Sequence, residues 1–155
     1  MTTENALTPE GYADLSRELD TLNTIRRPEI VKKLTEAVAE GDLKENANYH
    51  DAKEQLAFIE GRIRYLEHTL KTATIIHKDG KTDVVSLGSQ VTIVEEGFDE
   101  EETYSIVGAA EANPSEGKIS NRSPIGAALL GAKKGEKVRV KTPNGDSVFR
   151  IKKIQ

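Results

Sequence analysis

The sequence contains no cysteine, which excludes a disulfide framework, a thiolate metal site and a cysteine nucleophile. No run approaches the roughly 18 consecutive apolar residues of a membrane-spanning helix, so no membrane contact is expected. The first residues, MTTENALTPEGY, lack a basic segment followed by an apolar one, and no signal peptide is predicted. Neither a glycine-rich phosphate loop nor a nucleophile motif is present. The absence of a signal peptide and of a membrane-spanning run makes the cytoplasm the expected location.

Aromatic side chains and basic charge are also in short supply. After residue 76 the only aromatic residues are Phe98, Tyr104 and Phe149. These are too few to indicate the aromatic-lined proline pocket of a prolyl isomerase. The formal net charge is −4, with 10 basic against 14 acidic residues in 1–76 and 12 of each in 77–155. A free-standing duplex-DNA binder is usually basic, so autonomous nucleic-acid binding is not favoured.

A long helical segment is predicted to begin at Thr8-Pro9-Glu10, where a capping hydroxyl precedes a proline and an acid. Apolar residues then recur at steps of mostly three or four until Gly41. They are Leu15, Leu19, Leu22, Ile25, Ile30, Leu34 and Val38. Pro28 removes one backbone hydrogen bond, and we expect it to kink the helix or shift its register.

A second helical segment carries a regular heptad pattern, which consists of Tyr49, Ala52, Leu56, Ile59, Ile63, Leu66 and Leu70. If the two segments pair antiparallel, the numbers of facing residues keep a nearly constant sum. The sum is 85 for Leu15 with Leu70 and 87 for Val38 with Tyr49, and it drifts across the Pro28 region. The pattern predicts an antiparallel coiled-coil hairpin, with each arm of about 30 residues roughly 45 Å long.

The segment GDLKENANYHD, residues 41–51, lies between the two arms and carries two carboxylates, Asp42 and Glu45, three residues apart. This spacing fits a helix capping box, in which Asp42 accepts a hydrogen bond from the backbone N–H of Glu45. It also fits a pair of ligands for a divalent ion such as Mg²⁺, completed by oxygen ligands from a partner. Spacing alone leaves both interpretations open.

Behind this acidic tip the same pairing gathers a group of basic residues on the middle of the hairpin. The group comprises Arg26, Arg27, Lys32, Lys33, Lys53, Arg62 and Arg64. One interpretation is a solvated coiled-coil surface whose cations pair with Glu29, Glu36, Glu54 and Glu60. The other is a phosphate-contacting patch that guides a nucleic acid toward the tip.

From residue 81 onward the apolar period changes to two, as in half-buried strands. The predicted strands are residues 90–95, 103–107, 136–141 and 147–151, with a hairpin turn at 143–146. Residues 124–130 form a short helix capped by Ser123, and the acidic run 99–102 is expected to be a solvated loop. The fold class is therefore α+β, with an N-terminal antiparallel coiled-coil hairpin followed by a small antiparallel-sheet domain with a short helix.

Several of these motifs resemble one family. GDLKENANYHDAKEQ, with RRPEI before it and EGRI after it, is similar to the tip region of the bacterial transcript cleavage factors GreA and GreB. SPIGAALLGAKKGE and VKTPNG resemble the C-terminal domain of the same family, so the resemblance runs from about residue 8 to the end. It implies a coiled coil that enters the secondary channel of RNA polymerase and an FKBP-like domain that docks at the channel rim.

The resemblance also implies roles for particular residues. The tip acids of the family, here Asp42 and Glu45, help to hold the second catalytic Mg²⁺ of the polymerase, which then hydrolyses the 3′ end of backtracked RNA. The protein would have no cofactor of its own. The position of Lys53 belongs to the patch that contacts this RNA, to which we add Arg26, Arg27 and Lys33.

Two positions depart from the family pattern, since Asn48 stands where glutamate is expected and Asp51 where a small residue is common. We expect both to tune the strength of cleavage. The intact pair of tip acids favours an active factor over a homologue that inhibits the polymerase, and the modest basic patch favours the GreA type.

The predicted domains are a hairpin over residues 1–76, a linker over 77–80 and a polymerase-docking domain over 81–155. The expected partners are bacterial RNA polymerase and the 3′ end of the nascent RNA, and the protein is expected to act as a monomer. Two other functions stay open at this point. One is a regulator that occupies the polymerase channel without inducing cleavage, and the other is a coiled-coil chaperone with isomerase-like activity.

Overall fold

The computed structural model describes residues 5–77 and 83–155 and confirms the α+β class with an N-terminal helical hairpin. By their internal contacts, the residues form two compact units, Ala13–Thr72 and Met1–Tyr12 with Ala73–Gln155. The predicted linker at residues 77–80 lies outside the described residues, except for His77. None of the helices in the described ranges is long and apolar enough to cross a bilayer.

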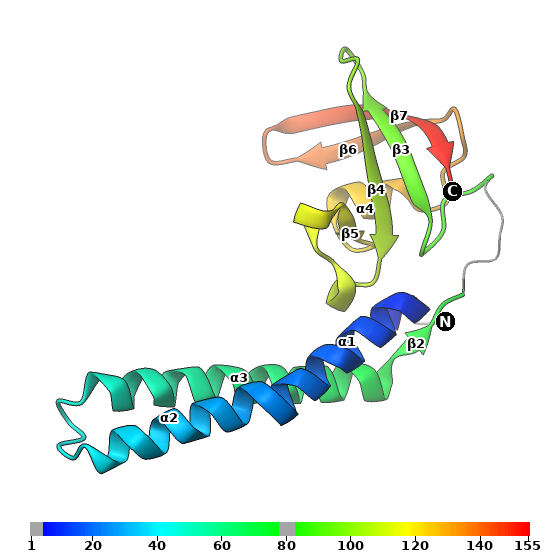
Figure 1. The fold of residues 1–155 in the computed structure, drawn as a ribbon. Coiled ribbons are helices and arrows are strands. Elements are labelled where there is room, and N and C mark those ends of the chain that lie inside the picture. Colours follow the sequence, from blue (N-terminus) through cyan, green and yellow to red (C-terminus); the bar gives the residue numbers. More distant parts are fainter. Residues whose placement is uncertain (1–4, 78–82) are drawn as a thin grey trace. The chain divides into compact units, whose positions relative to one another are not determined.

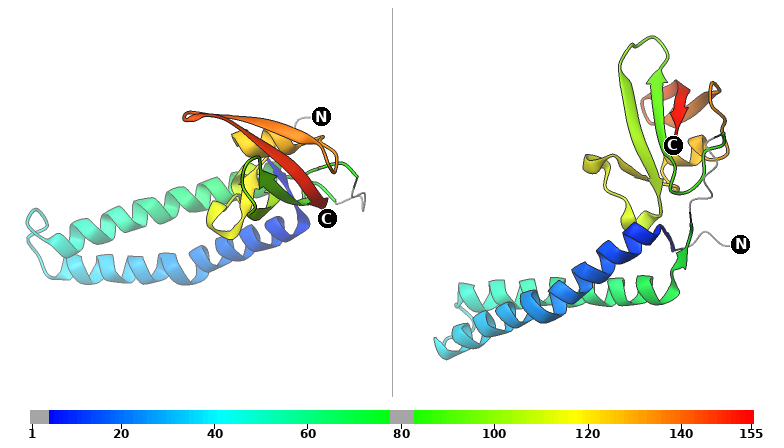
Figure 2. Two further views of the ribbon diagram at one scale, coloured as in Figure 1. Left: turned by 90° about the horizontal axis from the view of Figure 1, so that it is seen from above. Right: turned by 45° about the vertical axis from the view of Figure 1, so that its right-hand side comes forward.

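The hairpin consists of two antiparallel arms, which lie side by side over the part nearest the tip in Figures 1 and 2. The first arm comprises α1 (Pro9–Thr21), the π-helical turn η1 (Leu22–Arg26) and α2 (Arg27–Ala39), and the second is α3 (Ala47–Thr72). The start at Thr8 is confirmed, because its hydroxyl accepts a hydrogen bond from the backbone N–H of Gly11 at 3.0 Å. An apolar cluster joins the arms and contains Leu19, Leu22, Ile30, Leu56, Ile59 and Ile63.

The π-helical turn explains the drift in the facing residues. Arg27 donates its N–H to the carbonyl of Leu22, five residues back, so this turn holds one residue more than an α-helical turn. Pro28 follows at once, and a proline in a regular α-helix collides with the carbonyl four residues earlier. The predicted register shift near Pro28 is therefore present.

Because of this shift, two residues that were predicted to face the second arm do not face it. Ile25 lies within the π-helical turn and is 52% exposed, and Val38 in the following helix is 48% exposed. Ile30 is buried as predicted, and Ala37 is buried in place of Val38. The extra residue rotates the apolar stripe of α2, so that these two side chains face the second arm.

A short parallel pair of strands joins the beginning and the end of the hairpin sequence. Strand β1 (Ala6–Leu7) pairs with β2 (Thr74–Ile75). Gly108 lies against β1 so closely that a Cβ there would be 1.7 Å from the carbonyl oxygen of Ala6. Strand β1 thus belongs to the same compact unit as the C-terminal half.

The C-terminal half forms a five-stranded sheet in the order β5–β4–β3–β7–β6 (Figure 1). Its strands are β3 (Gln90–Glu95), β4 (Glu101–Val107), β5 (Lys118–Ser120), β6 (Lys137–Thr142) and β7 (Gly145–Ile154). All neighbours are antiparallel except β5, which pairs parallel with β4. The four predicted strands are confirmed, whereas β5 was not predicted. The acidic run at 99–102 is only partly a loop, because β4 already begins at Glu101.

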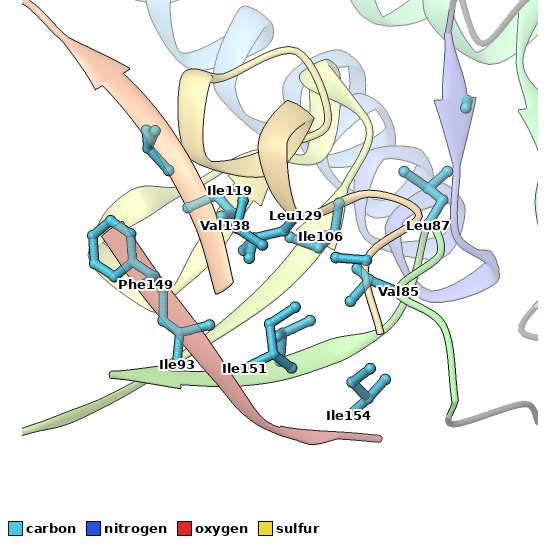
Figure 3. Packing of buried hydrophobic residues seen from close by; sticks show 14 residues of the cluster. Val85, Leu87, Ile93, Ile106, Ile119, Leu129, Val138, Phe149, Ile151 and Ile154 are labelled. Carbon is cyan, nitrogen blue, oxygen red and sulfur yellow. The ribbon is translucent and has the colours of Figure 1, made fainter. Parts of the chain in front are cut away.

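The core of this unit packs β-branched and leucine side chains between the sheet and helix α4 (Pro124–Leu129), as Figure 3 shows. Leu129 of the helix is fully buried, and so are Ile93, Ile106 and Ile151 of the strands. The predicted cap of this helix is confirmed, since Ser123 accepts a hydrogen bond from the N–H of Gly126.

Candidate functional site at the hairpin tip

The loop that joins α2 to α3 turns through two consecutive left-handed residues. Gly41 has φ +79° and Asp42 has φ +49°. Glycine adopts this region freely, and aspartate is among the few other residues that tolerate it. Before the turn, the N–H groups of Glu40 and Gly41 bond to the carbonyls of Ala37 and Val38, which tightens the last turn of α2. The helix therefore ends sharply at the tip.

The cap of α3 is Asn46, and the predicted capping box at Asp42 and Glu45 is wrong. The helix begins at Ala47, and the Oδ1 atom of Asn46 accepts a hydrogen bond from the N–H of Tyr49 at 3.1 Å. The N–H of Glu45 bonds to the backbone carbonyl of Asp42 at 3.2 Å, not to its carboxylate. The loop is thus a backbone turn, and its two acidic side chains take no part in the cap.

As a consequence, the carboxylates of Asp42 and Glu45 are both exposed and available. Within residues 5–77 and 83–155, neither makes a hydrogen bond or an ion pair through its side chain. Both line one shallow hollow with Glu40, Asn46 and neighbouring backbone. The structure therefore brings together the two acids that the sequence singled out.

The donor chemistry of this pair suits part of a site for a hard cation. Carboxylate oxygens are the protein ligands that Mg²⁺ prefers, and the ion takes six oxygen ligands in all. In the described part of the chain, no group of three or more His, Cys, Asp or Glu side chains is arranged to hold a metal ion. Asp42 and Glu45 fit a shared site, in which a partner and waters supply the other ligands.

The predicted basic patch divides into paired and unpaired residues. Arg26 lies 3.7 Å from a carboxylate oxygen of Glu29, and Arg27 lies 3.0 Å from one of Glu60. These pairs are largely exposed, and exposed ion pairs contribute little to stability. Of the two interpretations of the patch, the one in which the cations pair with glutamates on the hairpin surface therefore holds for Arg26 and Arg27.

Lys33 and Lys53 behave differently, because neither has an ion-pair partner in the portion that the structure describes. The Nζ atom of Lys53 lies 5.8 Å from the centre of the Tyr49 ring, one turn nearer the tip. Such a cation–π contact at an exposed site is worth roughly 0.5–1 kcal/mol, which orients the amine without neutralising it. These lysines keep their charge available for an anionic partner.

Two further tip residues were missed in the sequence. Asn46 is one, although asparagine is a preferred capping residue and precedes the first residue of the helix. The other is His50, whose Nε2 atom lies 3.1 Å from the carbonyl oxygen of Lys44 and braces the loop. No local pattern signals that second contact.

In the described part of the C-terminal unit, the aromatic rings are not gathered at one site. Phe149 is buried in the core, whereas Phe98 is 63% exposed between β3 and β4, so these rings do not line a common pocket. Burial raises the pKa of Tyr104, and the hydrogen bond to Glu102 and the negative charge of that carboxylate raise it further.

Comparison with known proteins gives consistent matches over both halves. Residues 5–75 match the family described as transcription elongation factor, N-terminal, and residues 80–155 match transcription elongation factor, GreA/GreB, C-term. The chain is 49% identical over 148 residues to transcription elongation factor GreA of Bacillus subtilis, which covers 96% of this chain and 94% of that protein. It is 47% identical over 153 residues to GreA of Acetivibrio thermocellus, with 98% and 96% covered. The crystal structure of GreA factor homolog 1 of Thermus thermophilus matches at 35% identity and a TM-score of 0.45, with 98% of this chain and 99% of that chain covered.

Proposed function

The chain belongs to the GreA/GreB family of transcription elongation factors, and on this premise we propose that it stimulates the cleavage of backtracked RNA by bacterial RNA polymerase. In this proposal the hairpin of a single copy enters the secondary channel of the polymerase and carries the tip to the active centre. The protein contributes carboxylates and does not catalyse the reaction alone. Arrested complexes thereby regain an RNA 3′ end in the active centre and resume elongation.

The observation that supports the proposal is the pair of exposed, uncommitted carboxylates at the end of a long arm. Helix α3 has 26 residues, which corresponds to about 39 Å at 1.5 Å per residue. Asp42 and Glu45 lie in the loop just before this helix, at the end remote from Thr72. A pair of ligands carried on such a rod suits delivery into a narrow channel.

Asp42 and Glu45 would hold a Mg²⁺ ion jointly with the polymerase, since two carboxylates fill only part of its six-oxygen shell. The bound ion would supply an activated water for phosphodiester hydrolysis. The task of the two side chains is to place negative oxygen atoms beside the RNA 3′ end. Because neither carboxylate is engaged within the described chain, no internal contact has to break first.

The basic patch would contact phosphates of the extruded RNA while the tip acts. Lys53 and Lys33 are the primary contacts in this proposal, because no ion-pair partner in the described residues competes for them. Arg26 and Arg27 would exchange their glutamate partners for phosphate, which is possible because both pairs are exposed. A positive patch of this kind also raises the local concentration of RNA near the tip.

Transcript cleavage in stalled polymerase complexes tests the proposal. We expect Asp42→Asn and Glu45→Gln each to lower the cleavage rate by at least about tenfold, since each removes one ligand charge while retaining the side-chain shape. Asp42→Asn suits the left-handed backbone, because asparagine tolerates positive φ as aspartate does. The control is Glu54→Gln, the same neutralisation at an exposed acid on α3, which should cleave like the wild type.

Two outcomes would count against the proposal. If both tip variants stimulate cleavage as well as the wild type, the carboxylates are not ligands in the reaction. If the wild type binds the polymerase and alters elongation without releasing short 3′ RNA fragments, the protein is a regulator that occupies the channel without inducing cleavage.

A further inference from the structure

One side chain, Asn46, joins the ends of both helices at the tip. Its Oδ1 atom accepts the N–H of Tyr49 at 3.1 Å, in the first turn of α3. Its Nδ2 atom donates to the carbonyl oxygen of Ala37 in α2 at 2.8 Å and lies 3.4 Å from that of Gly41. We propose that Asn46 is a positioning residue, which holds the loop so that Asp42 and Glu45 present their carboxylates as a pair. This inference rests on the proposed function.

The chemistry of these contacts requires an amide. The end of a helix leaves carbonyls without partners, and the start of the next leaves N–H groups without partners. Asparagine offers an acceptor and two donors from a single planar group, so it can serve both ends at once. Serine and aspartate also cap helix starts well, but the first has a single donor and the ionised second has none. A substitution at position 46 can therefore keep the cap of α3 while it removes the hydrogen bond to α2.

The loop depends on this bridge because few other hydrogen bonds in the described residues hold it. Gly41 and Asp42 both have positive φ, which glycine adopts freely and aspartate less readily. The loop is also held by the 3.2 Å bond from the N–H of Gly41 to Val38 and the 3.2 Å turn from Glu45 to Asp42. Two side chains of α3 add contacts, His50 with Lys44 at 3.1 Å and Asn48 with Glu40 at 3.4 Å. Without the bridge, we expect residues 41–46 to populate other conformations. The two carboxylates would then meet in the required geometry only part of the time.

The substitution that tests this is Asn46→Ser, with Asn23→Ser as the matched control at an exposed position of the first arm. Serine keeps the cap of α3 but is too short to reach the carbonyl of Ala37. In the isolated protein, we expect faster amide hydrogen exchange in residues 41–46, with the helical circular dichroism of α3 retained. Neither quantity should change in the control.

In stalled polymerase complexes, loosely held ligands should bind the shared ion less tightly. We expect Asn46→Ser to need about tenfold more Mg²⁺ for half-maximal cleavage, the size of effect that loss of a ligand-orienting partner commonly has. The protein concentration needed to occupy the polymerase, measured by competition with labelled wild type, should stay the same. A general loss of folding would raise that concentration, whereas a positioning role does not.

The results with the different variants distinguish failure of the positioning role from failure of the proposed function. If Asp42→Asn and Glu45→Gln both cleave like the wild type, the proposed function fails, and the amide exchange of Asn46→Ser alone decides whether the bridge holds the loop. If Asp42→Asn is defective but Asn46→Ser has the Mg²⁺ requirement of the wild type, the positioning role is refuted. Unchanged amide exchange in residues 41–46, or weaker occupancy of the polymerase as the sole defect, would refute it as well.

Discussion

Two isoleucines of the first arm test the consequence of the π-helical turn. Ile30 is 1% exposed and packs with Ile59 and Ile63 of the second arm. Ile25 lies five residues earlier, within the π-helical turn, and is 52% exposed. An uninterrupted apolar stripe would assign both to the seam. Replacing each by alanine therefore compares the same chemical change on the two sides of the register shift.

The expected magnitudes follow from burial. Ile30→Ala removes three buried carbon atoms, about 2.5 kcal/mol in transfer free energy at ~0.8 kcal/mol each, and leaves a cavity. We expect its total cost in the free energy of unfolding of the hairpin to be about 3–4 kcal/mol. Ile25→Ala loses about half of that transfer term and leaves no cavity, and alanine regains about 0.4 kcal/mol in helix propensity. Its net cost should be below about 1 kcal/mol.

Urea unfolding followed by the helical far-UV circular dichroism signal measures the difference. This signal reports mainly on the hairpin, because the one α-helix wholly inside the other described unit, α4, has only six residues. The reasoning is refuted if the two variants are destabilised equally, or if Ile25→Ala is the more severe. Either result would mean that the apolar stripe runs on through Leu22–Arg26 without the extra residue.

Three further predictions concern the patch and the C-terminal unit. Lys53→Ala should raise the protein concentration for half-maximal cleavage severalfold and flatten its salt dependence, whereas Arg27→Ala, which removes an internally paired charge, should have a smaller effect. Glu111→Ala removes two charge-assisted hydrogen bonds to Thr8, at the start of α1. It should lower the free energy of unfolding of the C-terminal unit in urea by about 2–4 kcal/mol, whereas the control Glu116→Ala, at an exposed acid, should cost less than about 0.5 kcal/mol. Gly108→Ala places a Cβ 1.7 Å from a carbonyl of β1, so increased proteolysis near the N-terminus should follow, and native resistance would contradict the packing.

The elements that periodicity predicted are those whose burial repeats along the chain. The heptad of α3 is visible because its buried residues, such as Ala52, Ile59 and Leu66, recur at helical spacing. Strand β3 was predicted to the residue, since its side chains alternate between core and surface. In both cases one face of a regular helix or strand is buried, so apolar residues recur in the sequence with the period of that element.

The elements that were missed depend on contacts between distant parts of the chain. Strands β1 and β2 have two residues each, too few to show alternation, and they pair across more than sixty residues. Strand β5 has three residues and forms only because β4 offers it a free edge. The π-helical turn shows in the sequence only as Pro28, which signals an irregularity without saying whether the helix bends or gains a residue.

At the tip, the sequence identified the right acids but assigned the cap to the wrong residue. Asp42 with Glu45 and Asn46 with Tyr49 both fit a helix start, because aspartate and asparagine cap equally well. What decides between them is where the chain leaves the left-handed conformation of Gly41 and Asp42. That backbone property has no counterpart in residue spacing, so the ambiguity was not resolvable from the sequence.

The assignment of the cap to a neutral side chain bears directly on the proposed chemistry. A carboxylate that caps a helix is held by backbone N–H groups, and these contacts compete with a metal for the same oxygen atoms. Because Asn46 provides the cap, Asp42 and Glu45 keep their oxygen atoms and their charge for an external ion. The same amide bonds to α2, and in our proposal this bond holds the loop, whose acids make no side-chain hydrogen bond or ion pair within the described residues. In the proposed mechanism, Asn46 would thus hold the loop while Asp42 and Glu45 bind the ion that is shared with the polymerase.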